Sequence, residues 1–240
     1  MRKVAVAIFC KTPLPGQSKT RLSPPLRPEE CAQLSACFIH DLARTVGKLA
    51  EDGDVAPYAL YWPLGTERAL RQLLPDSFNL MLQRDADFGS RLRDGLDDLL
   101  DAGHDGAILL NSDSPTLPLA ILRAAVDAVR SGDNVVLSPA LDGGYTLVGV
   151  SNRHPRLFED MPWSTSSVHR LTLDRAREID LPVVNVPGWY DVDDQASLNL
   201  LEQEFSGHPP KFASIAGADA LATRKFLQAR RQSTLSRSVA

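Results

Sequence analysis

The sequence predicts a single-domain α/β protein, with three layers (α/β/α) around a mostly parallel mixed sheet. Apolar runs of strand length alternate with segments of helical periodicity, which is the pattern of β-α-β units. No internal repeat and no clear domain boundary precede residue 206. Asp142-Gly143-Gly144 lies between two strand-like runs and predicts an antiparallel hairpin within the parallel sheet.

The first half of the chain is predicted to supply the first strands and helices of this sheet. The apolar run 3–10 is the first strand, and it is far too short to cross a bilayer. A helix begins at Pro28, because proline fits the first helical turn and apolar residues then recur on one face. The next elements are a strand at 55–62, a short helix at 66–74, a weaker strand at 78–82, a helix from Phe88 to near Gly103, and a buried strand at 106–111.

The second half is predicted to complete the sheet and to end in a basic tail. Its elements are a helix from Pro118, strands at 134–140 and 145–150, a helix ending near Ile179, a strand at 181–186 and a helix at 195–205. We therefore predict an α/β domain at 1–206. Residues 207–240 are predicted to be a tail, basic and partly helical or frayed.

Composition excludes several classes of function. The formal net charge of -4 argues against nucleic-acid binding, and no apolar run is long enough to span a membrane. The three cysteines are never spaced C-x-x-C, so we expect neither a disulfide scaffold nor a zinc site. We expect a cytoplasmic location. Nothing in the sequence predicts the oligomeric state.

The loop at 11–27 is the strongest local anomaly in this acidic chain. It follows the first strand, and it holds Lys11, Lys19, Arg21 and Arg27 with no acidic residue. Ligands of open α/β sheets bind beyond the carboxyl ends of the strands, and phosphates need fixed positive charge. The stretch from Gly16 to Arg21 matches neither a Walker A loop nor a dinucleotide fingerprint. Phosphate binding and a solvated, proline-stiffened loop both remain open from these residues.

Three aspartates follow predicted strands at the same edge of the sheet. Asp113 ends a buried strand, and Asp191 and Asp193 lie two residues apart after the last strand, so both can face one side of extended chain. Carboxylates of this kind suit Mg²⁺ or Mn²⁺, with water and phosphate completing the shell. The alternative is structural: Asp113 forms a turn, and Asp191, Asp193 or, more obviously, Asp194 caps the final helix.

Two further clusters at this edge are candidates for a substrate pocket. Gly143 and Gly144 first of all indicate a tight turn, although glycines also let the backbone approach a ligand closely. Tyr145 is not needed by such a turn. The stretch after Pro162 adds an aromatic ring and two hydroxyls, from Trp163, Ser164 and Thr165. The histidines are scattered, and neither a hydrolytic triad nor a zinc motif is present.

Six collinear motifs over residues 1–205 resemble one bacterial family. They are K-T-P-x-P-G-x-x-K-T-R-L, Q-x-x-x-D-F-G-x-R-L, S-D-S-P, S-P-A-x-D-G-G-Y-x-L-x-G, W-S-T and D-V-D. The sequence resembles the DUF2064 proteins, assigned as glycosyltransferases within the GT-A, or nucleotide-diphospho-sugar transferase, superfamily. It is also similar to nucleotidyltransferases of that superfamily.

The resemblance implies roles for individual residues. It implies that Lys11, Lys19 and Arg21 contact the phosphates of a nucleotide and that Asp113 binds the metal. Asp191 or Asp193 would be the second acidic ligand. Asp113 stands in S-D-S rather than in the paired D-x-D, which favours a metal that is held by only one carboxylate from this motif. The family motifs also contain Gly16, Gln83, Gly89 and Arg91, and we place Gly16, Gln83 and Arg91 with the nucleotide-binding residues.

We therefore expect a metal-dependent transferase that acts on a nucleoside-diphosphate sugar and an unidentified small-molecule acceptor. Asp142 is the candidate for orienting or deprotonating the acceptor hydroxyl. The alternative is a nucleotidyltransferase, which moves NMP from an NTP to a phosphorylated acceptor and releases pyrophosphate. A third hypothesis is a nucleotide-binding protein without catalysis.

Overall fold

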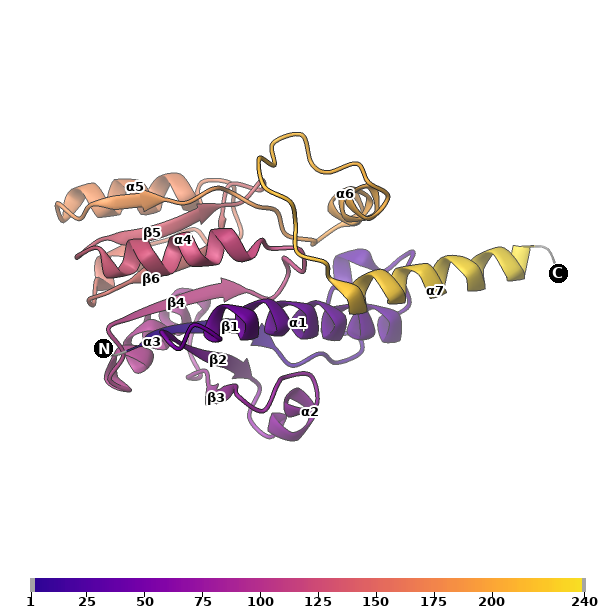
Figure 1. Cartoon of the computed structure of the whole chain (residues 1–240), viewed down its shortest axis with the longest axis horizontal. Helices are drawn as coiled ribbons and strands as arrows, with labels where there is room; N and C mark the ends of the chain where they lie inside the picture. The colour runs from indigo at the N-terminus through magenta and orange to yellow at the C-terminus, as the bar shows by residue number, and fades with distance from the viewer. Residues whose placement is uncertain (1–2, 239–240) are drawn as a thin grey trace.

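The sheet forms the middle layer of the molecule, between two layers of helices (Figure 1). The computed structural model describes the backbone of residues 3–238 and the side chains of residues 3–233. Within this part of the chain, seven strands form one sheet in the order β3-β2-β1-β4-β6-β5-β7. They are β1 (Val4–Lys11), β2 (Val55–Trp62), β3 (Asn79–Leu82), β4 (Gly106–Asn111), β5 (Val135–Pro139), β6 (Tyr145–Val150) and β7 (Val183–Asn185).

The predicted hairpin is confirmed, and it gives the sheet its one antiparallel strand among the described residues. β6 runs antiparallel to β4 and to β5, whereas the remaining neighbours pair in parallel. The turn closes through hydrogen bonds from Ala140 N to Gly144 O and from Gly143 N to Ala140 O. The hairpin turn therefore lies at the edge of the sheet where β1, β2 and β4 end.

The helices follow the predicted order, with small differences at their ends. They are α1 (Pro28–Ala50), α2 (Glu67–Arg71), α3 (Phe88–Asp101), α4 (Leu119–Arg130), α5 (Val168–Glu178), α6 (Gln195–Phe205) and α7 (Leu221–Ser238), with 3-10 turns η1 (Thr20–Leu22) and η2 (Pro155–Phe158). α2 is shorter than predicted. Its last residues instead form i→i+3 bonds, from Leu73 N to Leu70 O and from Leu74 N to Arg71 O, just before Pro75.

Two apolar cores lie on opposite faces of the sheet. Alternate residues of β1 separate them, because Val4, Val6 and Ile8 face one core while Ala5 and Ala7 face the other. The first core is covered by α1, α4 and α6, and the second by α3, η2 and α5. Both faces of the central strands are thus buried, which explains their continuous apolar sequences.

The carboxyl-terminal helix α7 lies along α1, and its far end extends past the body of the domain (Figure 1). The buried carboxylate of Asp41, on α1, accepts hydrogen bonds from Ala222 N (3.0 Å) and Thr223 N (2.8 Å) at the start of α7. Further along, Arg230 Nη2 donates to Pro25 O at 3.1 Å. α7 is thereby attached to α1 and to the loop that precedes it. The domain limit at residue 206 stays a prediction.

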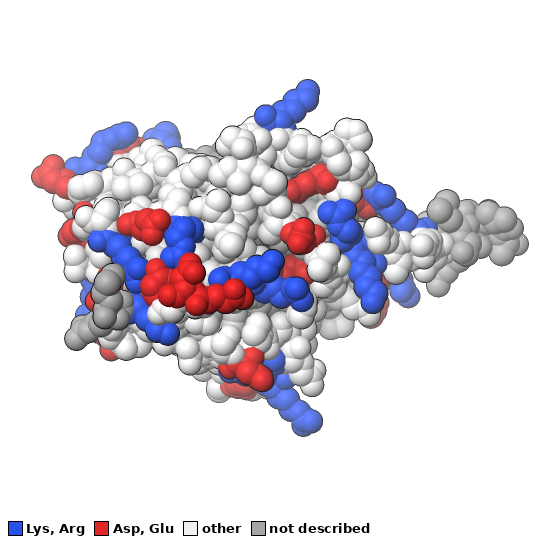
Figure 2. Space-filling model, viewed as in Figure 1, with Lys and Arg blue, Asp and Glu red and all other residues white. Residues whose placement is uncertain are grey.

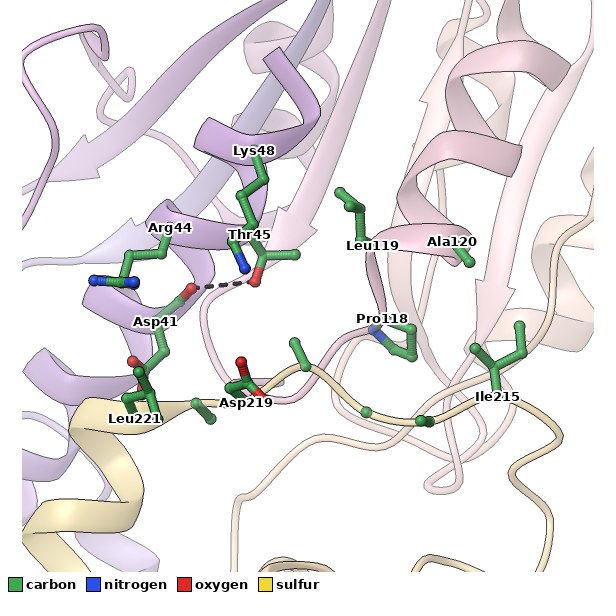
Figure 3. Close-up of a pocket in the computed structure, with 14 residues that line it drawn as sticks. Asp41, Arg44, Thr45, Lys48, Pro118, Leu119, Ala120, Ile215, Asp219 and Leu221 are labelled. Atoms are coloured by element: carbon green, nitrogen blue, oxygen red, sulfur yellow. Dashed lines mark hydrogen bonds between the residues drawn. The ribbon is translucent and has the colours of Figure 1, made fainter. Parts of the chain in front are cut away.

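A cavity of about 300 Å³ lies beside this attachment (Figure 3). It is bordered by α1, by the start of α4 and by the segment 215–221. Arg44 and Lys48 line it from α1, and Asp219 lines it from the segment before α7. It lies away from the strand ends that carry the predicted site.

Acidic and basic side chains lie next to each other over the face shown in Figure 2. One such group joins α4 to the turn before β2: Arg123 pairs with Asp52 and Asp54, and Arg130 pairs with Asp54 at 2.7 Å. Across residues 3–238, no helix has both the length and the apolar character that a membrane span requires.

Asp41→Ala is expected to weaken the attachment of α7. The substitution leaves two backbone N–H groups without their charged acceptor, which should lower the free energy of unfolding by about 1–3 kcal/mol. Urea denaturation measures this loss, and amide hydrogen exchange should rise in α7. Asp127→Ala, at an exposed position of α4, is the control and should change stability by less than about 0.5 kcal/mol. Equal losses in the two variants would contradict this role of Asp41.

Candidate active site

The loop after β1 folds back over the ends of the strands rather than extending into solvent. Ser18 Oγ accepts a hydrogen bond from Leu14 N, and Leu14 O accepts from Gln17 N and Ser18 N. Leu22 and Leu26 are buried in the core below. Gly16 has a φ of 72°, which glycine adopts without strain, so it forms a turn of the loop, and its predicted contact with a nucleotide stays a prediction.

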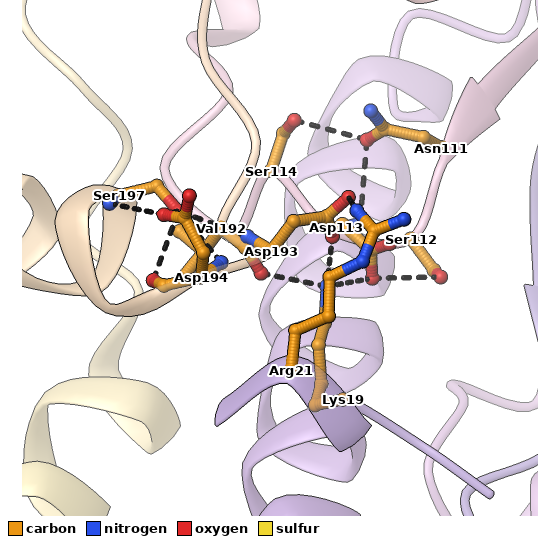
Figure 4. A network of polar contacts seen from close by, with 10 residues as sticks. All are labelled: Lys19, Arg21, Asn111, Ser112, Asp113, Ser114, Val192, Asp193, Asp194 and Ser197. Carbon is orange, nitrogen blue, oxygen red and sulfur yellow. Dashed lines mark hydrogen bonds and ion pairs between the residues drawn. The ribbon is translucent and has the colours of Figure 1, made fainter. Parts of the chain in front are cut away.

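Lys19 lies at the centre of the site (Figure 4). Its Nζ is 2.7 Å from Asp113 Oδ1, 2.9 Å from Asp193 Oδ1 and 2.7 Å from Val192 O, and its side chain is 4% exposed. Burial opposes the charged form, but the charges and hydrogen bonds of Asp113 and Asp193 outweigh it and raise the pKa of Lys19. The ammonium therefore ties three loops together. Direct contact between Lys19 and a phosphate stays a prediction and would require it to leave one of these acceptors.

The other basic residues of the loop face outward. Arg21 has an exposed side chain whose Nη1 is 3.8 Å from Asp193 Oδ2. Lys11 is exposed, and its Nζ lies 5.2 Å from the centroid of the Trp62 ring, at the end of β2. Both cations are accessible to a ligand at this edge of the sheet. Their predicted contacts with phosphate remain open to test.

The turn after β4 is built around Asn111. Its Oδ1 accepts hydrogen bonds from Asp113 N (3.2 Å) and from Ser114 Oγ (2.9 Å). Asp113 O in turn accepts from Val192 N at 2.9 Å, which joins this turn to the segment after β7. Asp113 thus forms a turn, as the structural alternative supposed, while its carboxylate still faces Lys19.

Asp191 and Asp193 are not needed to cap the last helix, because Asp194 does this. Asp194 accepts a hydrogen bond from Ser197 N at 2.9 Å, and its hydrogen bonds with the backbone and side chain of Ser197 lower its pKa. By contrast, the pKa of Asp191 is raised from 3.8 to about 7, first by burial and then by the charges of Asp193, Asp142 and Asp113. The four carboxylates therefore form one concentrated region of negative charge.

The side chains of this region suit a hard divalent cation. The carboxylate of Asp191 makes no hydrogen bond or ion pair with another described residue, and four acids here face the two cations Lys19 and Arg21. Across residues 3–238, no group of three acidic, histidine or cysteine side chains converges as a ready-made metal site. Such an ion would take most of its ligands from water and substrate phosphates, as Mg²⁺ commonly does.

The Asp142-Gly143-Gly144 turn brings a second group of predicted residues to the site. Asp142 Oδ1 accepts from Gly144 N at 2.8 Å. Gly143 has a φ of 89°, and a Cβ on it would overlap the backbone of Ser166. Glycine is required here because the turn packs against the segment that carries Trp163, Ser164 and Thr165.

Most of these residues, though not Gly143 or Ser166, line a cavity of about 290 Å³, which we call the aromatic cavity. Phe9, Phe88 and Trp163 form one wall, and Tyr145, Ser164 and Thr165 also border it. The four carboxylates of Asp113, Asp142, Asp191 and Asp193 lie around it together with Arg21. The predicted substrate residues are thus gathered in one place, and Phe9 and Phe88 are additions that the sequence analysis missed.

A second cavity of about 250 Å³, which we call the basic cavity, lies over the loop after β1. Lys11, Lys19 and Arg21 line it, with polar residues of the same loop. The two cavities share four lining residues, namely Arg21, Ser112, Asp113 and Asp193. A polar, cation-lined space and an aromatic space therefore meet at Asp113.

Gln83 directly follows β3 and Arg91 lies in the first turn of α3, and neither of them lines either cavity. Gln83 is buried, and its Nε2 donates to Cys10 O (3.1 Å) and to Leu60 O (2.8 Å). Its Oε1 accepts from Arg91 Nη1 at 3.3 Å, and the Arg91 guanidinium lies 5.8 Å from the Trp62 ring centroid. Gln83 thus joins strand ends, and its predicted contact with a nucleotide stays a prediction.

The D-F-G part of the same motif has a clear structural role. Asp87 caps α3 by accepting from Ser90 N at 3.1 Å. The ring of Phe88 then contacts Trp163 edge to face, with centroids 5.2 Å apart. A Cβ on Gly89 would overlap the Trp163 indole. The motif therefore builds the wall of the aromatic cavity, and its only signal in the sequence was the D-F-G motif itself, because the exposure of Phe88 depends on the fold.

Comparison with known proteins agrees with this geometry. The fold is that of the nucleotide-diphospho-sugar transferases. The chain belongs to the family described as "Uncharacterized protein conserved in bacteria (DUF2064)", which matches residues 45–165. A candidate nucleotide-diphospho-sugar transferase from Desulfovibrio desulfuricans G20 has a similar structure, with a TM-score of 0.81 and 25% identity over 99% of this chain and 98% of that chain.

More distant structures share the fold alone. CMP:2-keto-3-deoxy-manno-octonic acid synthetase, solved with CTP, has a TM-score of 0.56 and 13% identity over 85% of this chain and 99% of its own. A cytidylyltransferase from Leptospira borgpetersenii serovar Hardjo-bovis has a TM-score of 0.52 and 12% identity over 98% and 96% of the two chains. These neighbours are transferases. Comparison with curated proteins found no match.

Lys19→Met is expected to destabilise the protein, because it leaves Asp113 and Asp193 close together without their shared cation. The two carboxylates are 31% and 41% exposed, so water screens part of the repulsion, and we expect a loss of about 1–3 kcal/mol in the free energy of unfolding. Urea denaturation measures it. Lys11→Met changes an exposed lysine of the same loop and should cost less than about 0.5 kcal/mol. A Lys19→Met variant as stable as Lys11→Met would show that the buried ammonium does not hold the loops.

Asp191→Asn is expected to stabilise the protein at neutral and basic pH. Because the pKa of Asp191 is raised on folding, its ionisation costs stability, and this cost grows as the pH rises from the unfolded value of about 4 towards 7. The variant should exceed the natural protein by about 1–2 kcal/mol at pH 8 and match it at pH 4. Unfolding curves at the two pH values test this. Asp127→Asn, which is exposed, should show no such difference.

Proposed function

We propose that this protein is a transferase that moves a sugar from a nucleoside diphosphate to a small-molecule acceptor. The observation that carries the proposal is that two cavities of opposite chemistry meet at Asp113. The basic cavity suits a charged donor, and the aromatic cavity suits an uncharged group. A structural relative at 25% identity, a candidate nucleotide-diphospho-sugar transferase, supports the same class of donor.

The donor diphosphate would bind over the loop after β1. Arg21 and Lys11 are exposed there and supply positive charge where negative charge develops on the leaving diphosphate. Lys19 would act mainly by holding Asp113 and Asp193 in position. Gln83 and Arg91 lie beside this loop, next to Trp62, and are proposed to contact the nucleotide.

Asp113, Asp191 and Asp193 would hold Mg²⁺ or Mn²⁺. When bound, the ion supplies positive charge that stabilises the departing diphosphate. The protein contributes the carboxylates, and Lys19 and Arg21 keep them from repelling one another before the ion binds. A site with these few carboxylate ligands fits a metal ion whose ligand shell is completed by substrate phosphates.

Asp142 would orient the acceptor hydroxyl and take its proton. It lines the aromatic cavity on a short turn, and its Oδ1 is fixed by Gly144 N while no described residue donates to its Oδ2. In the transfer, the acceptor oxygen bonds to the anomeric carbon and the bond from that carbon to the phosphate oxygen breaks. The nucleoside diphosphate leaves with the electron pair, and the hydroxyl proton passes to the carboxylate.

Nucleotidyl transfer is the alternative, and the basic loop is the feature that favours it. A triphosphate carries more charge than a nucleotide sugar for the loop to neutralise. Against it stands the acidic rim of the aromatic cavity, which would repel a phosphorylated acceptor. The two reactions release different products, so they are directly separable.

Product analysis tests the proposal. The protein is incubated with Mg²⁺ or Mn²⁺ and a panel of NTPs and nucleotide sugars, and the released products are separated by ion-exchange chromatography. We expect release of a nucleoside diphosphate from at least one nucleotide sugar and no pyrophosphate from any NTP. Pyrophosphate release would establish the alternative. Nucleotide binding with neither product would establish a binding protein without catalysis.

Arg21→Gln is expected to lower kcat/KM for the nucleotide sugar by about tenfold to a hundredfold, because it removes a cation next to the developing charge. Arg27→Gln is the matched control, since Arg27 lies at the other end of the same loop and pairs with Glu30. Steady-state kinetics of diphosphate release compares them. Equal effects of the two substitutions would remove Arg21 from the site.

A further inference from the structure

The wall of the aromatic cavity is built to hold a ring in place. Phe88 contacts Phe9 edge to face at 6.0 Å and Trp163 at 5.2 Å between ring centroids. The Phe88 side chain nevertheless remains 43% exposed, although it directly follows the Asp87 cap of α3. Gly89 leaves the space that the Trp163 indole needs. Rigid aromatic edges and faces of this kind bind apolar rings.

Part of the remaining lining of the cavity is apolar. Leu92 of α3, Leu109 of β4 and Leu147 and Val148 of β6 line it, and these residues belong to the packed core. Polar side chains also line the cavity, among them Asn111, Thr146 and Ser164, so the apolar residues and the aromatic wall favour a ring that carries polar substituents. An apolar cavity of roughly 150 Å³ is enough for benzene, so about 290 Å³ holds a ring with substituents.

The charges around the cavity decide which rings can enter. Asp113, Asp142, Asp191 and Asp193 line it, with Arg21 as the cation among its lining residues. A bound divalent ion does not remove this excess, because its charge is offset by that of the donor diphosphate. An acceptor with a phosphate or carboxylate would therefore be repelled, whereas a neutral or cationic one would not.

We propose that the acceptor of this protein is a neutral or cationic compound with an aromatic or other apolar ring, whose hydroxyl or amine points towards Asp142. This inference rests on the proposed function, since it names the acceptor for the same site. The ring would lie against Phe88 and Trp163, and its nucleophile would face the boundary with the basic cavity. Phosphorylated and carboxylated acceptors are excluded by the rim.

Ligand binding tests this without requiring turnover. ¹⁹F NMR titration of the full-length protein, with UDP and Mg²⁺ present, compares 4-fluorobenzyl alcohol, 4-fluorobenzylamine and 4-fluorobenzoate. We expect the benzoate to bind at least about tenfold more weakly than the other two, with a smaller difference at high salt. Glucose is included as a competitor, and it should not displace the alcohol.

Phe88→Ala should weaken binding of 4-fluorobenzyl alcohol about fivefold. Phe212→Ala is the matched control, because Phe212 is also 43% exposed but contacts Trp189 and Tyr190 away from this cavity. Gly89→Ala is a second variant that displaces Trp163 and should also weaken binding. Circular dichroism and thermal unfolding establish that each variant is folded.

The outcomes separate this inference from the proposed function. Failure of all ring probes to bind, equal binding of the benzoate, displacement of the alcohol by glucose, or equal effects of Phe88→Ala and Phe212→Ala would each overturn the inference. Release of a nucleoside diphosphate is measured separately. If it occurs while the ring probes fail, the function stands and the acceptor class is wrong. If the ring probes bind as expected but no nucleoside diphosphate is released, the inferred ligand class of the aromatic cavity stands and the proposed transferase function is wrong.

Discussion

The organisation of the site depends on one buried ammonium group. Lys19 Nζ lies within 2.9 Å of Asp113, Asp193 and the carbonyl of Val192, which come from two separate parts of the chain, the turn after β4 and the segment after β7. Without a cation at this point, the turn after β4 and the segment after β7 would bring like charges together. The charge of Lys19 lets acidic residues gather at a sheet edge that also carries the exposed cations Lys11 and Arg21.

That constraint explains how two cavities of different chemistry adjoin in one small region. Cations of the loop after β1 border one side, and aromatic residues from β1, α3 and the segment before α5 border the other. The carboxylates lie on the boundary, where the bonds of a transfer reaction would be made and broken. The acidic excess costs folding stability, as the raised pKa of Asp191 indicates, and this cost is typical of a functional site.

Most of the fold could be predicted from the sequence, because hydrophobic periodicity and turn residues are local signals. The strands at 55–62, 106–111 and 145–150 and the helix at 195–205 were predicted with their observed bounds. The sequence also indicated that basic and acidic residues gather at one sheet edge. It could not indicate that Lys19 points inward, nor that Asp41 receives α7, because these depend on packing between distant segments. Phe9 and Phe88 were missed for the same reason.

The hydrogen bond from Arg230 to Pro25 O connects the carboxyl-terminal helix α7 to the loop after β1. Pro25 belongs to the same loop that presents Arg21 and inserts Lys19, so α7 acts as a brace behind it. A substitution along α7, such as one at Arg230, would therefore reach the loop that holds Lys19 and Arg21.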